Sequence, residues 1–424
     1  MIKFALQAET APESEPASRD QYIAPVPRVS IQVFCESPDT AAMVQAAAAD
    51  RRMVKAHVKV QMGGVAAAAE AYRNAPTPNV IVIESESRNE DLLAGIDTLA
   101  EVCDVGTRVI VIGRINDIQF YRELVRRQVS DYLIAPVDVL DFIRSVSGLF
   151  AAPGTKPVGR LLAVVGAKGG VGASTVAHNI AWAIARDLRL DAVVADLDLP
   201  FGTAGLDYNQ DPPQGLADAV FSPERIDTNF VDRLLSKCTD HLSLLAAPAT
   251  LERVYDFGAE AFDSVFDVLR STVPCTVLDI PHVWTGWAKR VLVGADDILI
   301  VAAPDLANLR NVKNLLDLLK QTRPNDQPAN YCLNQVGVPK RPEIKQADFA
   351  KALEAEPIAL IPFEPQIFGT AANNGQMIAE VSANHRAAET FRHLAQVMTG
   401  RSEQKRMRTG LLSPLIEKLK RRQA

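Results

Sequence analysis

A glycine-rich segment in the middle of the chain has the residue types that bind phosphate groups. The run Lys168-Gly169-Gly170-Val171-Gly172-Ala173-Ser174-Thr175 follows an aliphatic stretch, residues 161–165, and opens a helix-like stretch, residues 174–182. Glycines let several backbone N–H groups converge on phosphate oxygens, and a helix N-terminus favours negative charge. Strand, glycine loop and helix in this order predict a nucleotide site with the Ser174 hydroxyl on Mg²⁺. The alternative is a relic loop that no longer binds nucleotide.

This loop resembles that of the ParA/MinD family of deviant Walker-A ATPases, whose usual pattern is Lys-Gly-Gly-Val-Gly-Lys-Thr-Thr. The resemblance implies that residues 168–175 bind ATP or ADP, and that Lys168 reaches across a dimer interface to the partner's phosphates. The family's second lysine, which contacts the β- and γ-phosphates, is Ala173 here, and Ala167 stands where the general pattern has a glycine. Losing a cation beside the transferring phosphoryl group predicts weaker triphosphate binding and slower hydrolysis, by about 2–4 kcal/mol.

Further segments match the same family at the carboxyl ends of strand-like runs, where parallel sheets bind ligands. Residues 193–198 end in two carboxylates, and the resemblance implies that Asp198 orients the attacking water while Asp196 supports Mg²⁺ or a switch loop. Residues 277–281 resemble Walker B, with Asp279 holding the metal through water. Each aspartate has helix capping as its alternative role.

Two late segments resemble the part of the family that holds the base. Asn334 corresponds to the adenine-reading asparagine, and Pro362 lies in a stretch, residues 361–365, that resembles the loop flanking the base. His282, Trp284 and Trp287 follow the Walker B segment, and packing on a switch loop is the favoured interpretation of these three.

The elements that must position these residues form two series of alternating strands and helices, which predict parallel sheets covered on both faces. We predict a tail over residues 1–28, a first domain over 29–150, a linker over 151–159, a nucleotide-binding domain over 160–400 and a basic tail over 401–424. The fold class is α/β, with two doubly wound parallel-sheet domains. In the second domain, seven runs of aliphatic residues predict buried strands: 161–165, 192–197, 242–246, 276–280, 298–302, 331–334 and 358–361.

The first domain resembles a response-regulator receiver, with its flavodoxin-like strand order, but the residues for phosphoryl transfer are missing. Glu36 is the one acid after the first strand, and Glu84 replaces the aspartate that accepts phosphate. Gly113 supplies no hydroxyl, and Ala135 stands where a lysine is usual. We therefore expect this domain to make protein–protein contacts and not to be phosphorylated.

A receiver-like domain ahead of a MinD-like domain with a disrupted phosphate loop resembles the CpaE/TadZ proteins of Tad (Flp) pilus assembly, over residues 29–395. Segments 196–202 and 304–311 fit that group too. The resemblance implies a cytoplasmic protein that marks the assembly site, often a cell pole or the inner face of the inner membrane, and recruits pilus and secretion proteins.

Charge is unevenly placed along the 424 residues, whose net charge is −6. Residues 401–424 hold eight Lys/Arg and two Glu, a net +6, so the rest of the chain carries −12. An acidic body makes nucleic acid an unfavourable partner. Residues 413–422 predict a short basic amphipathic helix that docks on a membrane or a partner, with a solubilising tail as the alternative. Five scattered cysteines and the absence of a signal sequence favour the cytoplasm.

The leading hypothesis is a nucleotide-responsive scaffold in which ATP promotes a homodimer that positions pilus components. The sequence leaves three alternatives open. The first alternative is a cycling ATPase on a membrane or DNA surface. The second is a partition ATPase that binds DNA, and the third is a dimer that needs no nucleotide. Ala173 argues against rapid hydrolysis, while Lys168, Asp198 and Asp279 argue for it.

Overall fold

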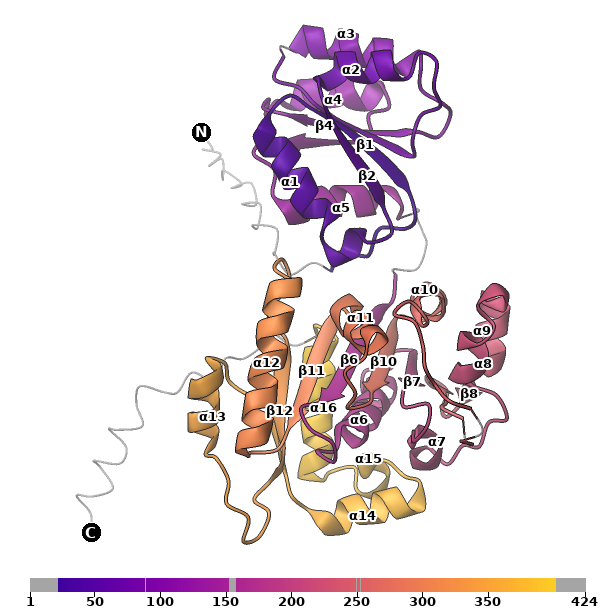
Figure 1. Ribbon diagram of the computed structural model, residues 1–424, viewed down its shortest axis with the longest axis vertical. Helices are drawn as coiled ribbons and strands as arrows, with labels where there is room; N and C mark the ends of the chain where they lie inside the picture. The colour runs from indigo at the N-terminus through magenta and orange to yellow at the C-terminus, as the bar shows by residue number, and fades with distance from the viewer. Residues whose placement is uncertain (1–21, 88, 152–157, 249, 252, 402–424) are drawn as a thin grey trace, which may run out of the picture. The chain divides into compact units, whose positions relative to one another are not determined.

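The computed structural model describes residues 22–87, 89–151, 158–248, 250–251 and 253–401. The chain divides into two compact units, Met1–Pro153 and Gly154–Ala424. Each unit contains a sheet with helices on both faces (Figure 1), which confirms the predicted α/β fold class. Within the described ranges, no helix combines the length and the hydropathy that crossing a bilayer requires. The predicted basic amphipathic helix lies outside them.

The first unit has a parallel five-stranded sheet of order β2-β1-β3-β4-β5, the flavodoxin-like order that the receiver resemblance predicts. Its strands are β1 (Ser30–Cys35), β2 (His57–Met62), β3 (Val80–Glu84), β4 (Arg108–Gly113) and β5 (Asp131–Ile134). Its helices are α1 (Pro38–Ala48), α2 (Gly64–Ala71), α3 (Asn89–Ala100), α4 (Ile118–Arg126) and α5 (Val139–Leu149), with a 3₁₀ turn at Arg51–Met53.

Successive side chains of each buried strand in the first unit lie on opposite faces of the sheet. In β3, Val80 and Val82 pack with α1 and α5, while Ile81 and Ile83 pack with α2 and α3. All five residues of β3 are buried, as a central parallel strand requires. Helices α3 and α4 complete the second face.

The start of the first unit differs from the prediction that residues 1–28 form a tail. Ile23 and Val26 are buried among the side chains of α1 and α5, and the Val26 N–H donates to the carbonyl of Arg52. The Ser147 hydroxyl donates to the carbonyl of Ala24. Apolar side chains at 23 and 26 therefore extend the core of this unit by several residues.

The second unit has an eight-stranded sheet of order β13-β12-β11-β6-β10-β7-β9-β8, parallel except for the β8–β9 pair. Strand β6 (Arg160–Gly166) lies between β10 (Cys275–Ile280) and β11 (Asp297–Ala302). The seven aliphatic runs predicted as strands are strands here. The other five strands are β7 (Ala192–Asp196), β8 (Ser236–Lys237), β9 (Leu242–Leu245), β12 (Asn330–Val336) and β13 (Ala359–Pro362).

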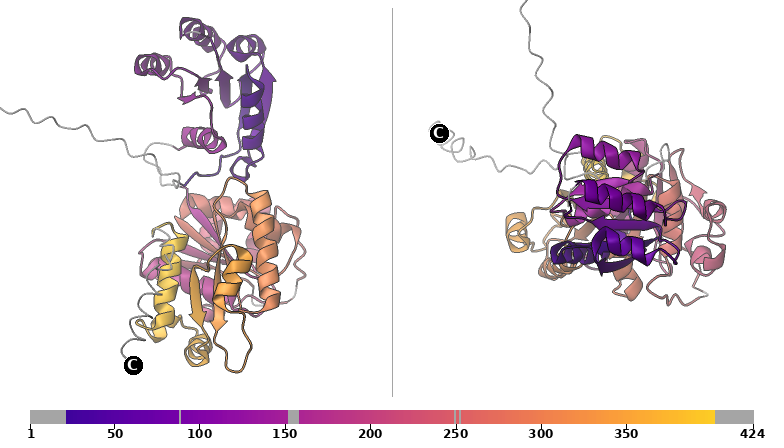
Figure 2. Two further views of the ribbon diagram at one scale, coloured as in Figure 1. Left: turned by 90° about the vertical axis from the view of Figure 1, so that its left-hand side faces the viewer. Right: turned by 90° about the horizontal axis from the view of Figure 1, so that it is seen from above.

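Two layers of helices cover the sheet of the second unit. One layer packs with α6 (Ala173–Arg186) and the other with α12 (Leu306–Thr322), and Figure 2 shows α12 and α16 on opposite sides of the strands. With α6 lie α7 (Ala204–Asp207), α14 (Pro365–Asn374), α15 (Ile378–Val381) and α16 (Arg386–Met398). With α12 lie α8 (Leu216–Val220), α9 (Thr228–Leu234), α10 (Asp263–Thr272), α11 (Gly286–Gly294) and α13 (Gln346–Leu353), with a 3₁₀ turn at Pro223–Arg225.

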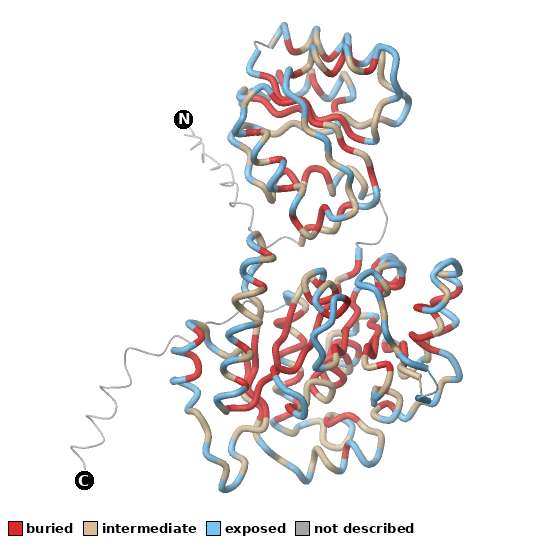
Figure 3. The backbone as a smooth tube through the Cα atoms, in the orientation of Figure 1, coloured by how far each residue is buried: buried red, intermediate tan, exposed pale blue. Residues whose placement is uncertain are grey.

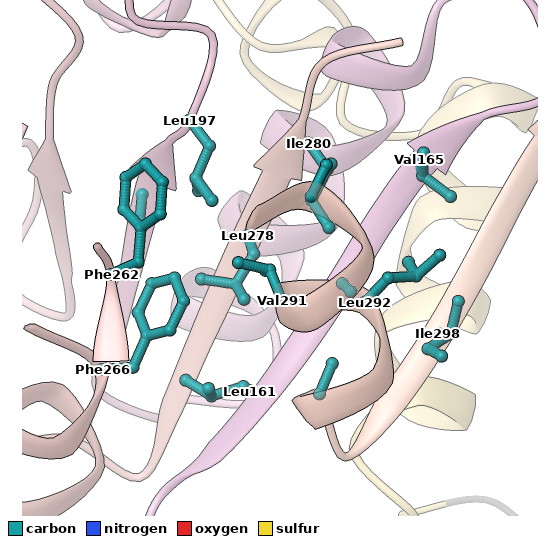
Figure 4. Packing of buried hydrophobic residues seen from close by; sticks show 14 of the residues in the cluster. Leu161, Val165, Leu197, Phe262, Phe266, Leu278, Ile280, Val291, Leu292 and Ile298 are labelled. Atoms are coloured by element: carbon teal, nitrogen blue, oxygen red, sulfur yellow. The ribbon is translucent and has the colours of Figure 1, made fainter. Parts of the chain in front are cut away.

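Burial follows the strands in both units, which form the red centre of each sheet in Figure 3. On the α12 side, Leu278 of β10 lies beneath Val291 and Leu292 of α11, with the rings of Phe262 and Phe266 beside them (Figure 4). This packing fixes β6 and β10, whose carboxyl ends carry the glycine loop and Asp279.

Candidate functional site

The glycine loop connects β6 to α6 and takes backbone conformations that glycine adopts readily. Gly170 and Gly172 have φ angles of 78° and 82°, in the left-handed region. Gly172 is the N-cap of α6 and provides no side-chain acceptor for the first helical N–H groups. A side chain at Gly169 or Gly170 would meet nothing within 4 Å, so this part of the loop is open. The open amides are suited to an anion.

Side chains from later segments of the chain hold the carbonyl groups of this loop. Each donates one hydrogen bond to a loop carbonyl, and a carbonyl that is held in this way cannot face an anion in the loop. A carbonyl oxygen only accepts, so His282 carries its proton on Nδ1 here. The pairs are His282 Nδ1 with Gly166 (2.9 Å), Asn311 Nδ2 with Ala167 (2.8 Å), Gln335 Nε2 with Gly170 (3.0 Å) and Asn334 Nδ2 with Val171 (2.8 Å).

Asn334, which the sequence assigns to adenine reading, contacts the loop itself. It is buried, and its Oδ1 accepts the N–H of Gln335 at 2.8 Å while its Nδ2 donates to the carbonyl of Val171. A Cβ at Gly172 would lie 2.7 Å from that Nδ2, which explains the glycine at this position. Base reading by Asn334 stays a prediction. So does the base contact of Pro362, which ends β13 next to the partly exposed Phe363.

Asp196 and Asp279 lie side by side on β7 and β10, at the same edge of the sheet as the loop. Both are buried. The two oxygens of Asp196 accept the N–H groups of Asp198 and Ala204, each at 3.1 Å. Burial and the nearby charge of Asp279 raise the pKa of Asp196 to about 7. A positive charge close by would favour the ionised form of both carboxylates.

The residues proposed for catalysis are less buried. Lys168 is exposed, and its ammonium group has no ion-pair partner in the part of the chain that the structure describes. The Asp198 carboxylate accepts the N–H of Phe201 at 3.2 Å, so in this conformation it stabilises the turn formed by residues 198–201. Burial raises the pKa of Asp198, and Asp279 adds to the increase. Ala173, Ser174 and Thr175 form the first turn of α6, all partly exposed.

A buried histidine lies behind the two aspartates. Nδ1 of His178, on α6, is 2.7 Å from Oδ2 of Asp207, and Nε2 is 3.3 Å from Oδ2 of Asp279. The second contact is an ion-pair approach without hydrogen-bond alignment. Burial acts to lower the pKa of His178, but Asp207 and Asp279 outweigh it and raise the pKa to about 10. His178 is thus the cation of this carboxylate cluster.

The sequence analysis assigned no role to His178, Asn311 or Gln335, and it interpreted His282 as a packing residue. Their contacts join segments far apart in the chain, so local patterns do not reveal them. The available signal was position: His282 lies just after β10, Gln335 near the end of β12, and Asn311 on the helix that follows β11. For His178 the signal was a titratable residue among alanines and aliphatic residues on a helix.

In the first unit, the pocket that would accept phosphate in a receiver is closed by its own carboxylate. Glu84 is buried and accepts hydrogen bonds from two N–H groups and two hydroxyl groups around the start of α1. Tyr132 fills the space over Gly113, and its hydroxyl bonds to Ile115. The donors to Glu84 are the N–H groups of Glu36 and Ser37 (both 2.8 Å), Ser37 Oγ (2.6 Å) and Thr40 Oγ1 (2.7 Å).

Magnesium and nucleotide fit the residues of the second unit. The loop presents open amides, its carbonyls are bonded to side chains, and Ser174 lies in the first turn of α6. Among the described residues, no group of three or more His, Cys, Asp or Glu side chains forms a metal site by itself.

Known proteins resemble the chain in two ways, and no model of a protein family matches it. The N-terminal part is 47% identical to the pilus assembly protein CpaE of Caulobacter crescentus, a match that covers 31% of this chain and 100% of that structure, with a TM-score of 0.30. Here the sequence identity over the whole of the shorter chain shows the relationship.

The other resemblance is to nucleotide-binding proteins. The chain is 22% identical over 259 residues to the septum site-determining protein MinD of Bacillus subtilis, covering 58% of this chain and 91% of MinD. A ParA family ATPase of Chlorobium tepidum is 24% identical, over 56% of this chain and 98% of that chain, with a TM-score of 0.50. At this level of identity these matches support the fold and carry no conclusion about activity.

Proposed function

Because the chain belongs to the CpaE family of pilus assembly proteins, we propose that it is a nucleotide-responsive scaffold for assembling pili of the Tad (Flp) type. In this proposal, Mg·ATP binds at residues 168–175 and stabilises a homodimer, and hydrolysis is weak or absent. The dimer recruits pilus and secretion proteins at the inner face of the inner membrane or at a cell pole.

The observation that carries nucleotide binding is the arrangement of the loop. Four carbonyls are bonded to side chains, while the glycine amides and the uncapped start of α6 remain open. Pre-set amides need little rearrangement to bind a polyanion, since the backbone is already in the required conformation. This support does not depend on the lysine that is missing at Ala173.

The absence of that lysine shapes the rest of the proposal. Bound Mg²⁺ would neutralise phosphate charge, with Ser174 and Asp279 as the residues that hold it and Asp196 beside them. Ala173 offers no charge to a developing negative charge in the transition state, which lowers the expected hydrolysis rate by about 10²–10³-fold. A slow hydrolytic step favours a stable bound state over rapid cycling.

Dimerisation is supported by what lies exposed at the binding edge. Lys168 is free to contact a second molecule, and large apolar side chains stand just beyond the ends of strands β7, β10, β11 and β13 of the same sheet. Their exposed fractions are 71% for Phe201, 58% for Trp284, 73% for Leu306 and 37% for Phe363. Exposed apolar groups of this size around one site are typical of an interface.

Titration calorimetry of the full chain with ATP and with ADP, each with Mg²⁺, followed by sizing of the same samples, tests the proposal. We expect binding of both nucleotides and a doubling of mass with Mg·ATP, and Lys168→Ala should remain a monomer. No binding at millimolar nucleotide would leave only a passive adaptor.

The alternative is an active ATPase of the ParA/MinD type, which the retained Lys168, Asp198 and Asp279 favour. Steady-state phosphate release by the wild type, compared with Asp198→Ala, separates the two. A rate that Asp198→Ala abolishes would identify a cycling enzyme. Equal, near-zero rates would support the scaffold.

A further inference from the structure

His178 occupies an unusual place for a histidine. Its side chain is completely buried on α6, five residues after Ala173. Its two ring nitrogens approach carboxylates on different elements, Asp207 at the end of α7 and Asp279 on β10. Both nitrogens of a protonated imidazole are donors held in a rigid ring, so His178 can serve one carboxylate at each nitrogen.

A second attachment joins the same two helices. The hydroxyl of Tyr208, directly after α7, donates to the backbone carbonyl of His178 at 2.7 Å. The Tyr208 ring lies against His178, with centroids 5.6 Å apart, and stacks on Trp182 at 6.4 Å. Helix α7 is therefore held to α6 by a side-chain contact, a hydrogen bond and ring packing, all within one turn of His178.

The other end of the connection is fixed by Asp196. Residues 197–208, here called the β7–α7 segment, directly follow Asp196, whose oxygens accept the Asp198 and Ala204 N–H groups. Asp196 and Asp279 are paired on adjacent strands. The segment is thus attached to Asp279 at both ends, by the Leu197 N–H donating to the Asp279 carbonyl at its start and through His178 at its end.

The β7–α7 segment also carries a surface. Phe201 and Leu206 are 71% and 72% exposed. A change in how firmly the segment is held would therefore alter two large apolar groups that face solvent. The buried contact of His178 can therefore affect the exposed surface of the protein.

We propose that His178 is a positioning residue that couples the Asp279 side of the Mg·nucleotide site to the β7–α7 segment. The proposal rests on the proposed function, since it assigns a response to the nucleotide. When Mg²⁺ is bound near Asp279, His178 transmits the altered position of that carboxylate to Asp207. Without the imidazole, α7 and Asp279 respond independently.

Hydrogen exchange of the full chain provides the test, with and without Mg·ATP, in wild type, His178→Gln and a matched control, His241→Gln. His241 makes the same type of contact, Nδ1 to Asp191 at 2.8 Å, but between two exposed side chains. In His178→Gln without nucleotide, we expect exchange of the β7–α7 segment to rise by about tenfold or more, since buried polar contacts suppress local opening.

On adding Mg·ATP, exchange of the segment should slow in wild type and in His241→Gln, and change by less than about twofold in His178→Gln. Calorimetry should show about tenfold weaker binding of Mg·ATP to His178→Gln, with binding of ATP in EDTA within about twofold of wild type. A merely structural role would weaken both forms of ATP equally.

The coupling is overturned if His178→Gln matches wild type in segment exchange, or if it weakens ATP in EDTA as much as Mg·ATP. Should His178→Gln not fold, Asp207→Asn, which alters the partly exposed end of the contact, is expected to lose the same Mg·ATP response. Failure of the wild type to bind any nucleotide overturns the proposed function itself, and normal binding with an unaltered segment overturns only the coupling.

Discussion

Replacing Asn334 with alanine separates two roles that this residue can have. The change removes the hydrogen bond to the Val171 carbonyl and the acceptor for the Gln335 N–H. Each backbone group left without a partner costs about 1–3 kcal/mol, so for the two groups together the loop should lose about 2–6 kcal/mol of its support. If about 1.4 kcal/mol of this is needed to re-form the loop on binding, affinity falls by about tenfold.

Calorimetry with Mg·ATP and with Mg·tripolyphosphate, which lacks the base and sugar, is the informative assay. A residue that shapes the phosphate loop affects both ligands equally, whereas a residue that reads adenine affects only ATP. We expect Asn334→Ala to weaken both by about tenfold. Asn314→Ala, at an exposed position on α12, is the matched control and should bind as wild type. An unchanged affinity for tripolyphosphate, together with weakened ATP binding, would refute the loop-supporting role.

Three further changes probe the remaining charges. Ala173→Lys should tighten Mg·ATP binding about tenfold and raise phosphate release about 10²-fold, measured by calorimetry and steady-state assay; no gain in either would mean that the loop cannot direct a lysine at phosphate. Lys168→Glu should abolish the Mg·ATP-dependent dimer in sizing while circular dichroism stays unchanged. Glu84→Gln should destabilise the first unit by about 2–4 kcal/mol at pH 7, since it loses charge-assisted hydrogen bonds, measured by hydrogen exchange of α1. Burial raises the pKa of Glu84, but four hydrogen-bond donors outweigh it and lower the pKa below its usual value. The contribution of Glu84 to the stability of the first unit is therefore complete above about pH 4.3 and is lost as pH falls through the lower pKa of the folded state. Glu84→Gln should lack this dependence on acid.

The buried strands were the most predictable feature of the chain, because parallel strands covered on both faces are continuous aliphatic runs. Strand β2 lacks such a run, since it is an edge strand whose sequence, His57-Val58-Lys59-Val60-Gln61-Met62, is exposed or half-buried throughout. Strand β8 was not among the predicted strands, because its two residues, Ser236 and Lys237, are too few to form a run. Ile23 and Val26 were assigned to a tail because the polar, proline-containing sequence before them dominates the local composition.

The loop itself could be predicted, and the residues that support it could not. The pattern from Lys168 to Thr175 is local, so its chemistry can be recognised from the sequence. The partners of its carbonyls come from positions 282, 311, 334 and 335, more than a hundred residues later. Only the strand order brings them to the loop, and strand order is a property of the whole sheet.

The two units also show why one of them is better suited to a ligand. In each, a strand is followed by a helix whose first amides need an acceptor. At α1, the Ser37 hydroxyl accepts the Thr40 N–H, and Glu84 accepts the N–H groups of Glu36 and Ser37 just before the helix. At α6, Gly172 provides none, and the nearest carboxylates, Asp196 and Asp279, are occupied with backbone amides and with His178. The start of α1 therefore has its acceptors within the first unit, whereas the uncapped start of α6 presents N–H donors that are suited to an added anion.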